Sequence, residues 1–91
     1  MPLQVDLVSA DRTVWSGTAS TILARTLEGE IGILPGHSPV LALLAPGEIR
    51  IVPEQGEPVV AEVDGGFLSV EHDRVTVVSD TAQVGSGTPA R

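Results

Sequence analysis

Cysteine, lysine and asparagine are all missing from the 91 residues. Without cysteine the chain has no thiol nucleophile, no thiolate metal ligand and no disulfide. Without lysine it can form no Schiff base and has no phosphate-binding lysine of the P-loop type, and without asparagine it has no N-glycosylation acceptor. Two histidines, His37 and His72, are left for acid–base chemistry. Few classes of enzyme therefore remain compatible with the sequence.

Basic residues are also scarce, since five arginines stand against twelve aspartates and glutamates. The net charge of −7 argues against nucleic-acid binding, which needs a basic face to neutralise phosphates. The longest apolar run, residues 40–45, is far shorter than the roughly 20 residues of a membrane-spanning helix. Residues 1–10 carry no base and do not resemble a signal peptide. We expect no membrane insertion and a cytoplasmic location, with docking on a membrane-bound partner left open.

Seven prolines and ten glycines interrupt the sequence too often for stable helices, whereas short alternating runs favour strands. Leu3, Val5 and Leu7 alternate with polar residues and predict a first strand. Residues 14–26 are rich in β-branched side chains, and we interpret them as one long or bent strand with a bulge at Gly17. The other expected extended segments are 31–34 within an irregular loop at 28–38, 40–44, and 48–52 paired with 59–63.

The best hairpin signal spans residues 67–79, after a turn at Gly65-Gly66 that tolerates positive φ. With His72-Asp73 as a two-residue loop, apolar residues face apolar ones and opposite charges face each other. The expected facing pairs are Leu68 with Val77, Ser69 with Thr76, Val70 with Val75 and Glu71 with Arg74. A slip of one residue would turn the apolar side outward, so the register is well specified.

Several short strands with turns every 8–12 residues predict an all-β fold, a β-sandwich or small barrel in a single domain. We place this domain at residues 1–82. Residues 83–91 read QVGSGTPAR, which is poor in apolar residues and rich in glycine and proline, so they are expected to form a flexible tail.

The densest polar motif is EGEIGILPGHSPVL at residues 28–41. Glu28, Glu30 and His37 are too few converging ligands for a metal, and a solvated acidic turn is the preferred interpretation. The glycines of the motif lack the following helix and the G-K-[ST] of a phosphate-binding loop. Ser38 beside His37 lacks the G-x-S-x-G elbow of many serine hydrolases. We predict no catalytic residue, no metal and no cofactor, which leaves contact with a partner as the function.

The same motif, followed by LAPGEIRI at residues 44–51, closely resembles the N-terminal domain of the epsilon subunit of F-type ATP synthase. Three further matches to that family are Val14-Trp15-Ser16-Gly17, Gly65-Gly66-Phe67 and Asp80-Thr81-Ala82. The resemblance covers about residues 2–82, and four motifs in the right order make it specific.

The resemblance implies a two-layer β-sandwich of about ten strands at the foot of the rotor. Such a subunit is not catalytic, lies on the cytoplasmic face of the cell membrane, and couples the gamma subunit to the c-ring during proton-driven ATP synthesis. The residues implied to contact the c-ring are Glu28, Gly29, Glu30, Ile31 and Gly32. Glu30 is the first choice to pair with an arginine of the ring loops. The residues implied to contact gamma are His37, Ser38, Pro39 and Leu41.

One departure from the family lies at the C-terminal end. Family members usually continue into two helices that can inhibit ATP hydrolysis and in some species bind ATP, whereas residues 83–91 are too short for a helical hairpin. Neither that inhibition nor ATP binding is expected, and a naturally short or a trimmed chain would both fit.

Two other functions compete with this one. One is a small acidic β-sandwich binding module unrelated to ATP synthase, for which more aromatic residues than Trp15 and Phe67 would be expected. The other is a small hydrolase, which the residue inventory disfavours. Trp15 itself fits either a core position or an interface anchor.

Overall fold

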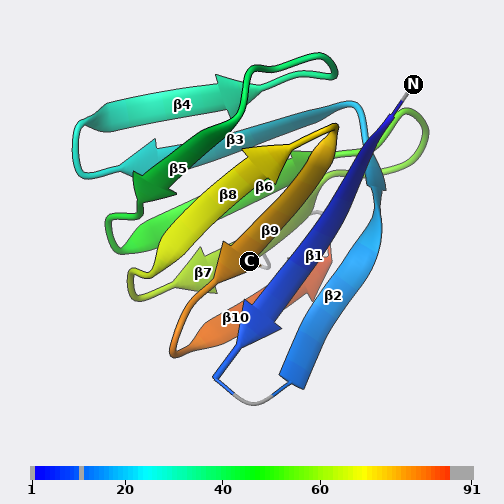
Figure 1. Cartoon of the computed structure of the whole chain (residues 1–91). Helices are drawn as coiled ribbons and strands as arrows, with labels where there is room; N and C mark the ends of the chain where they lie inside the picture. The colour runs from blue at the N-terminus through cyan, green and yellow to red at the C-terminus, as the bar shows by residue number, and fades with distance from the viewer. Residues whose placement is uncertain (1, 11, 87–91) are drawn as a thin grey trace.

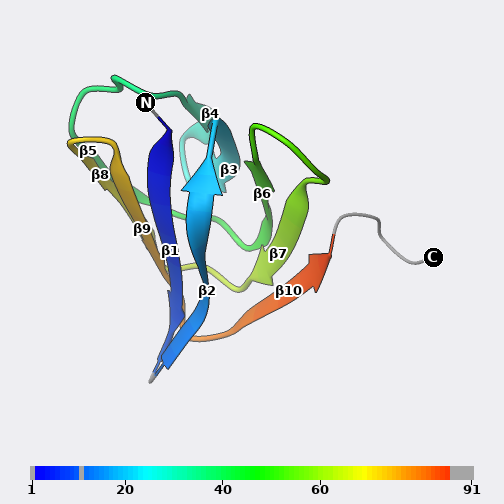
Figure 2. The same ribbon diagram turned by 90° about the vertical axis from the view of Figure 1, so that its right-hand side faces the viewer.

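The computed structural model describes residues 2–10 and 12–86, and its strands form two five-stranded sheets (Figure 1). The strands are β1 Leu3–Ser9, β2 Arg12–Ala19, β3 Thr21–Thr26, β4 Gly29–Ile33, β5 Val40–Leu43, β6 Gly47–Val52, β7 Val59–Val63, β8 Phe67–Glu71, β9 Arg74–Val78 and β10 Ala82–Ser86. The first sheet has the order β2-β1-β9-β8-β5 and the second the order β10-β7-β6-β3-β4. Figure 2 shows the sheets as two layers, which confirms the predicted two-layer β-sandwich. Nothing in the described ranges is a helix able to span a membrane.

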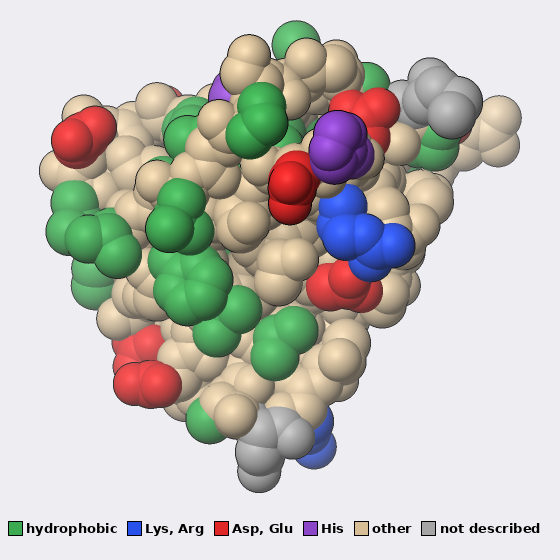
Figure 3. All heavy atoms as spheres, in the orientation of Figure 1, with side chains coloured by type: hydrophobic (Ala, Val, Ile, Leu, Met, Phe, Trp, Pro, Cys, Tyr) green, Lys and Arg blue, Asp and Glu red, His purple; other side chains and the backbone are tan. Residues whose placement is uncertain are grey.

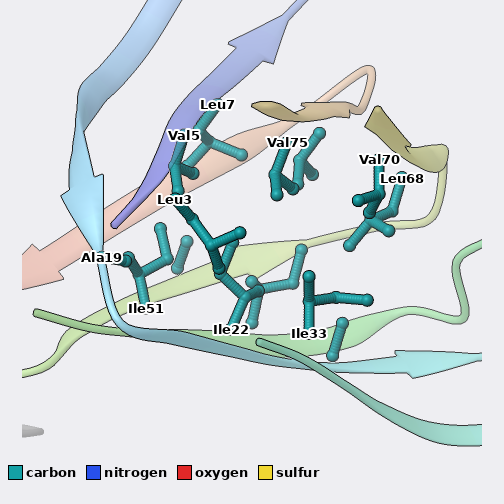
Figure 4. Close-up of a cluster of buried hydrophobic side chains, with 14 of the residues drawn as sticks. Leu3, Val5, Leu7, Ala19, Ile22, Ile33, Ile51, Leu68, Val70 and Val75 are labelled. Atoms are coloured by element: carbon teal, nitrogen blue, oxygen red, sulfur yellow. The ribbon is translucent and has the colours of Figure 1, made fainter. Parts of the chain in front are cut away.

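The core lies between the layers, where side chains of the two sheets point toward each other (Figure 4). Leu3, Val5 and Leu7 on β1 are fully buried, as their alternation predicts, because successive side chains of a strand point to opposite faces. Ile22 on β3 and Ile51 on β6 are buried from the opposite sheet. Burial of each such side chain contributes roughly 1.5–3 kcal/mol, so this aliphatic layer holds the two sheets together.

The β8–β9 hairpin has the predicted register. All four expected facing pairs are present, and His72 and Asp73 form the loop with φ of 53° and 59°. Positive φ at both loop residues is typical of the tight hairpin turns that match strand twist. The Arg74 guanidinium nevertheless pairs with Asp6 on the neighbouring β1, at 3.4 Å from Oδ2, although Glu71 is its cross-strand partner.

The single strand expected over residues 14–26 is wrong. The strand is interrupted at Ser20, where the chain leaves the first sheet at the end of β2 and enters the second sheet as β3. The Ser20 amide donates to the Val52 carbonyl oxygen (2.8 Å), and the Ser20 hydroxyl donates to the same oxygen (3.1 Å). These bonds to a distant residue fix the crossover.

The bulge expected at Gly17 is also misplaced. The β1–β2 register shifts between Leu7 and Val8, which leaves Val14 as the extra residue on β2. Gly17 instead lies against the Trp15 ring, where an added Cβ would come within 2.8 Å of Cη2. Trp15 is half-buried and packs against the core, which favours the core interpretation of this residue.

Two other segments contain more strand than expected. Residues 29–33 of the predicted irregular loop form β4, because they pair with β3 along their whole length. Residues 83–86, which we expected in the tail, belong to β10, where pairing with β7 and the packing of Val84 against the core outweigh the weak local pattern. The rest of the expected tail, 87–91, lies outside the described residues.

Asp64 forms hydrogen bonds at the corner where the chain crosses between the sheets twice, from β7 to β8 and from β9 to β10. Its carboxylate accepts bonds from the Thr81 hydroxyl (2.7 Å), the Ser79 hydroxyl (3.0 Å) and the Thr81 amide (3.3 Å). The Thr81 and Ser79 hydroxyls, in that order, lower the pKa of Asp64 by stabilising its charged form. The motifs Gly65-Gly66-Phe67 and Asp80-Thr81-Ala82, far apart in the sequence, therefore meet at one structural corner.

At this corner Gly66→Ala should destabilise the fold much more than Gly65→Ala. Both glycines have positive φ, so either substitution adds backbone strain of about 1–3 kcal/mol. A Cβ on Gly66 would in addition overlap the Val78 carbonyl oxygen, whereas a Cβ on Gly65 meets nothing closer than the Leu44 oxygen at 3.7 Å. Urea unfolding followed by Trp15 fluorescence measures the difference. Equal losses of stability would mean that the close approach at Gly66 is not rigid.

Candidate partner-binding surface

The structure brings both sets of predicted contact residues to one edge of the sandwich. Residues 28–32 comprise the second residue of the β3–β4 turn and most of β4, the edge strand of the second sheet. His37, Ser38 and Pro39 lie in the loop that leads to β5, the edge strand of the first sheet, and Leu41 lies on β5 itself. Both views show β4 and β5 on the same side of the molecule (Figures 1 and 2).

The β3–β4 turn is held by hydrogen bonds from both sheets. The Thr26 hydroxyl donates to the Gly29 oxygen (2.7 Å) and accepts from the Glu28 amide (3.1 Å), and Gly29 has φ of 130°. The Leu27 amide donates to the Leu43 oxygen on β5 (3.0 Å). The turn is therefore fixed both within its own hairpin and against the other sheet.

The acidic residues of this hairpin are exposed, and one of them, Glu30, forms an ion pair. Glu30 faces Arg25 across the strands, with 3.9 Å between Oε2 and the guanidinium, and the two side chains are 83% and 63% exposed. An exposed pair of this kind contributes about 0–1 kcal/mol, so a partner's cation can compete for Glu30. Ile31 packs partly against the core, whereas Glu28 and Gly32 are exposed.

The loop before β5 is anchored to the β8–β9 hairpin. The His37 amide donates to the Leu34 oxygen (3.1 Å), and Gly36, with φ of 86°, suits the third position of a type II turn. The Gly36 amide donates to Asp73 Oδ1 (2.7 Å). His37 Nδ1 lies 2.7 Å from the Ser38 carbonyl oxygen rather than against its hydroxyl. This geometry positions the loop and does not activate a nucleophile.

A row of apolar side chains that was not predicted from the sequence crosses the outer face of the first sheet. The apolar row consists of Leu43, Phe67, Val78 and Val8, which are neighbours in strand pairing. Leu43 is 62% exposed, and Leu41 on the same strand is 71% exposed. Figure 3 shows hydrophobic side chains gathered over β5 and β8 on this face. The sequence of β5 could have indicated this row, because apolar residues occupy both faces of that strand.

The outer face of the second sheet is different, because charges of both signs cover it. Arg25 and Arg50 alternate with glutamates around a shallow hollow of about 550 Å³, and Leu23 is its exposed apolar side chain. The side chains of residues 2–10 and 12–86 include no group of three or more histidines, aspartates or glutamates arranged to hold a metal. The exposed apolar surface is therefore concentrated on the first sheet and the edge beside it.

Comparison with known families matches residues 2–85 to the β-sandwich domain of the ATP synthase delta/epsilon chain. The ATP synthase epsilon chain of Micrococcus luteus is 49% identical over 88 residues, which cover 97% of each chain. The epsilon chain of Frankia casuarinae is 48% identical over 84 residues, which cover 92% of this chain and 99% of that one. Neither relative extends much beyond the matched region.

A similar fold occurs in a solved rotary assembly. A chain in the mitochondrial ATP synthase of Euglena gracilis, in a structure described as OSCP, F1 and c-ring, superposes with a TM-score of 0.86 at 28% identity. The match covers 91% of this chain and 53% of that chain. The whole sandwich is therefore shared with a component of that assembly.

Loss of the Thr26 hydroxyl should loosen the β3–β4 turn. Thr26→Val keeps the branched shape but removes both side-chain bonds, and a bond of this kind contributes about 1 kcal/mol. We expect the Glu28 amide to exchange with deuterium about fivefold faster, measured by NMR. Thr26→Ser, which keeps the hydroxyl, should exchange like the unsubstituted chain. Unchanged exchange in Thr26→Val would show that the turn does not depend on the hydroxyl.

Proposed function

The chain belongs to the β-sandwich family of ATP synthase delta and epsilon chains, and we propose that it is a non-catalytic central-stalk subunit that couples the gamma subunit to the c-ring. The observation that carries this proposal is the match of residues 2–85 to the family, together with one edge that presents two chemically unlike surfaces. In the assembled ATP synthase it would lie on the cytoplasmic face of the membrane, as a peripheral subunit. The same match disfavours an unrelated acidic binding module.

The gamma subunit would dock on the apolar surface of the first sheet. Exposed contiguous apolar surface is typical of protein–protein contact sites. Leu41 and the apolar row provide such a surface, and His37, Ser38 and Pro39 border it at the entry to β5. Burial of Leu41 and Leu43 against gamma would supply affinity, because both are more than half exposed in the free chain.

The c-ring would meet the β3–β4 hairpin, with residues 28–32 as the contact segment. Glu28 and Glu30 place exposed carboxylates there, and an arginine on a ring loop would pair with Glu30 in competition with Arg25. Such exposed charges orient a contact and speed its formation more than they add affinity. Because the hairpin tip is hydrogen-bonded to β5, the two partners would be joined through a rigid edge.

Leu41→Asp should weaken binding to the gamma subunit by at least about tenfold, because the new carboxylate would lose its hydration in the contact. Leu23→Asp is the matched control, since Leu23 is 46% exposed on the outer face of the other sheet. Titration of each variant with purified gamma, followed by calorimetry, measures the effect. Equal affinities for the two variants would contradict the assignment of the apolar face to gamma.

Glu30→Gln should weaken binding to the detergent-solubilised c-ring several-fold at low salt, and the difference should vanish at high salt, where exposed charges are screened. The control is Glu62→Gln, which removes an exposed carboxylate from β7 on the outer face of the second sheet. A ring affinity that changes equally in both variants would reflect net charge alone and would remove Glu30 from the contact.

A further inference from the structure

Leucine is an unexpected residue at the tip of the β3–β4 hairpin. Gly, Asn, Asp, Pro and Ser are the common residues of tight turns, yet Leu27, a residue that is 65% exposed, occupies the first position of the two-residue turn. A side chain so exposed adds little to the core. The contacts of Leu27 within the chain therefore do not explain why this position holds an apolar residue.

The tip presents Leu27 in a fixed position. The Leu27 amide donates a hydrogen bond to the Leu43 oxygen. The Thr26 hydroxyl bonds to the Glu28 amide and to the Gly29 oxygen, and so closes the turn that contains Leu27. A contact residue held in this way loses little backbone freedom when a partner covers it. The turn thus has the rigidity of a preorganised contact point.

The charges around Leu27 indicate what would cover it. Glu28 follows it directly, and Glu30 lies two residues further along the hairpin, where it forms the exposed ion pair with Arg25 at 3.9 Å. An apolar centre with a charged border is the usual arrangement of a protein contact site. The complementary surface is a loop that carries an apolar side chain beside an arginine or lysine.

We propose that Leu27 is the apolar anchor of the contact between this hairpin and a basic loop of the c-ring. The inference rests on the proposed function and adds to it a residue and a second type of interaction. The carboxylates orient the ring loop through salt-sensitive attraction, and Leu27 is buried against its apolar part. The ring contact then has a component that salt does not screen, which the acidic residues alone would not give.

Leu27→Ser, Leu27→Met, Glu30→Gln and the control Leu23→Ser test this proposal in titrations with the detergent-solubilised c-ring at low and high salt. We expect Leu27→Ser to weaken ring binding about tenfold at both salt concentrations, because it removes an apolar side chain from the contact. Leu27→Met should restore most of the affinity, and Leu23→Ser should bind normally. Thermal unfolding should leave all four variants folded, since each altered side chain is exposed.

Several results would overturn the proposal. Leu27→Ser could bind the ring with unchanged affinity, or could lose affinity at low salt alone. A parallel titration with gamma supplies a third: a loss confined to gamma would assign Leu27 to that partner instead. If Glu30→Gln still weakens ring binding, any of these outcomes removes the Leu27 anchor and leaves the proposed function standing. Absence of ring binding by the unsubstituted chain would instead contradict the proposed function itself.

Discussion

The contact between the two sheets depends on aliphatic side chains that alternate along each strand. Because no cysteine is available to cross-link this small domain, burial of residues such as Leu3, Ile22 and Ile51 must supply most of its stability. Hydrogen bonds then hold the places where the chain passes between sheets. Ser20 bonds to Val52 at one crossover, and Asp64 joins two more at another corner. The inward-facing side chains thus form the core, and the outer faces of the two sheets can carry different side chains.

The two outer faces and the edge between β4 and β5 have different chemistry. The first sheet carries the apolar row, the second carries mixed charges, and the hairpin tip at the edge carries acids around one leucine. The bond from the Leu27 amide to the Leu43 oxygen links the tip to β5, the strand that contributes Leu43 to the apolar row. We therefore interpret the molecule as a stiff connector, in which two contact surfaces keep a constant spacing because the same backbone bonds support both.

Local signals predicted the parts of the fold that depend on neighbouring residues. The β8–β9 hairpin was predicted pair by pair, because its loop and its alternation agree with each other. The break at Ser20 was missed because small and β-branched residues continue through it and the bonds that define it come from distant Val52. The apolar row was missed for a similar reason, as its four members come from four different strands. The hairpin residues of the candidate site were found only through the family resemblance of their motif.

Site-specific cross-linking in the assembled ATP synthase tests the connector most directly, because the chain contains no cysteine of its own. Single variants Glu28→Cys and Leu41→Cys, each carrying a short photoreactive group, would be reconstituted and their products identified by mass spectrometry. If the chain connects the two partners, position 28 labels the c-ring and position 41 labels gamma. Labelling of one and the same partner from both positions, or of neither, would contradict such a connection.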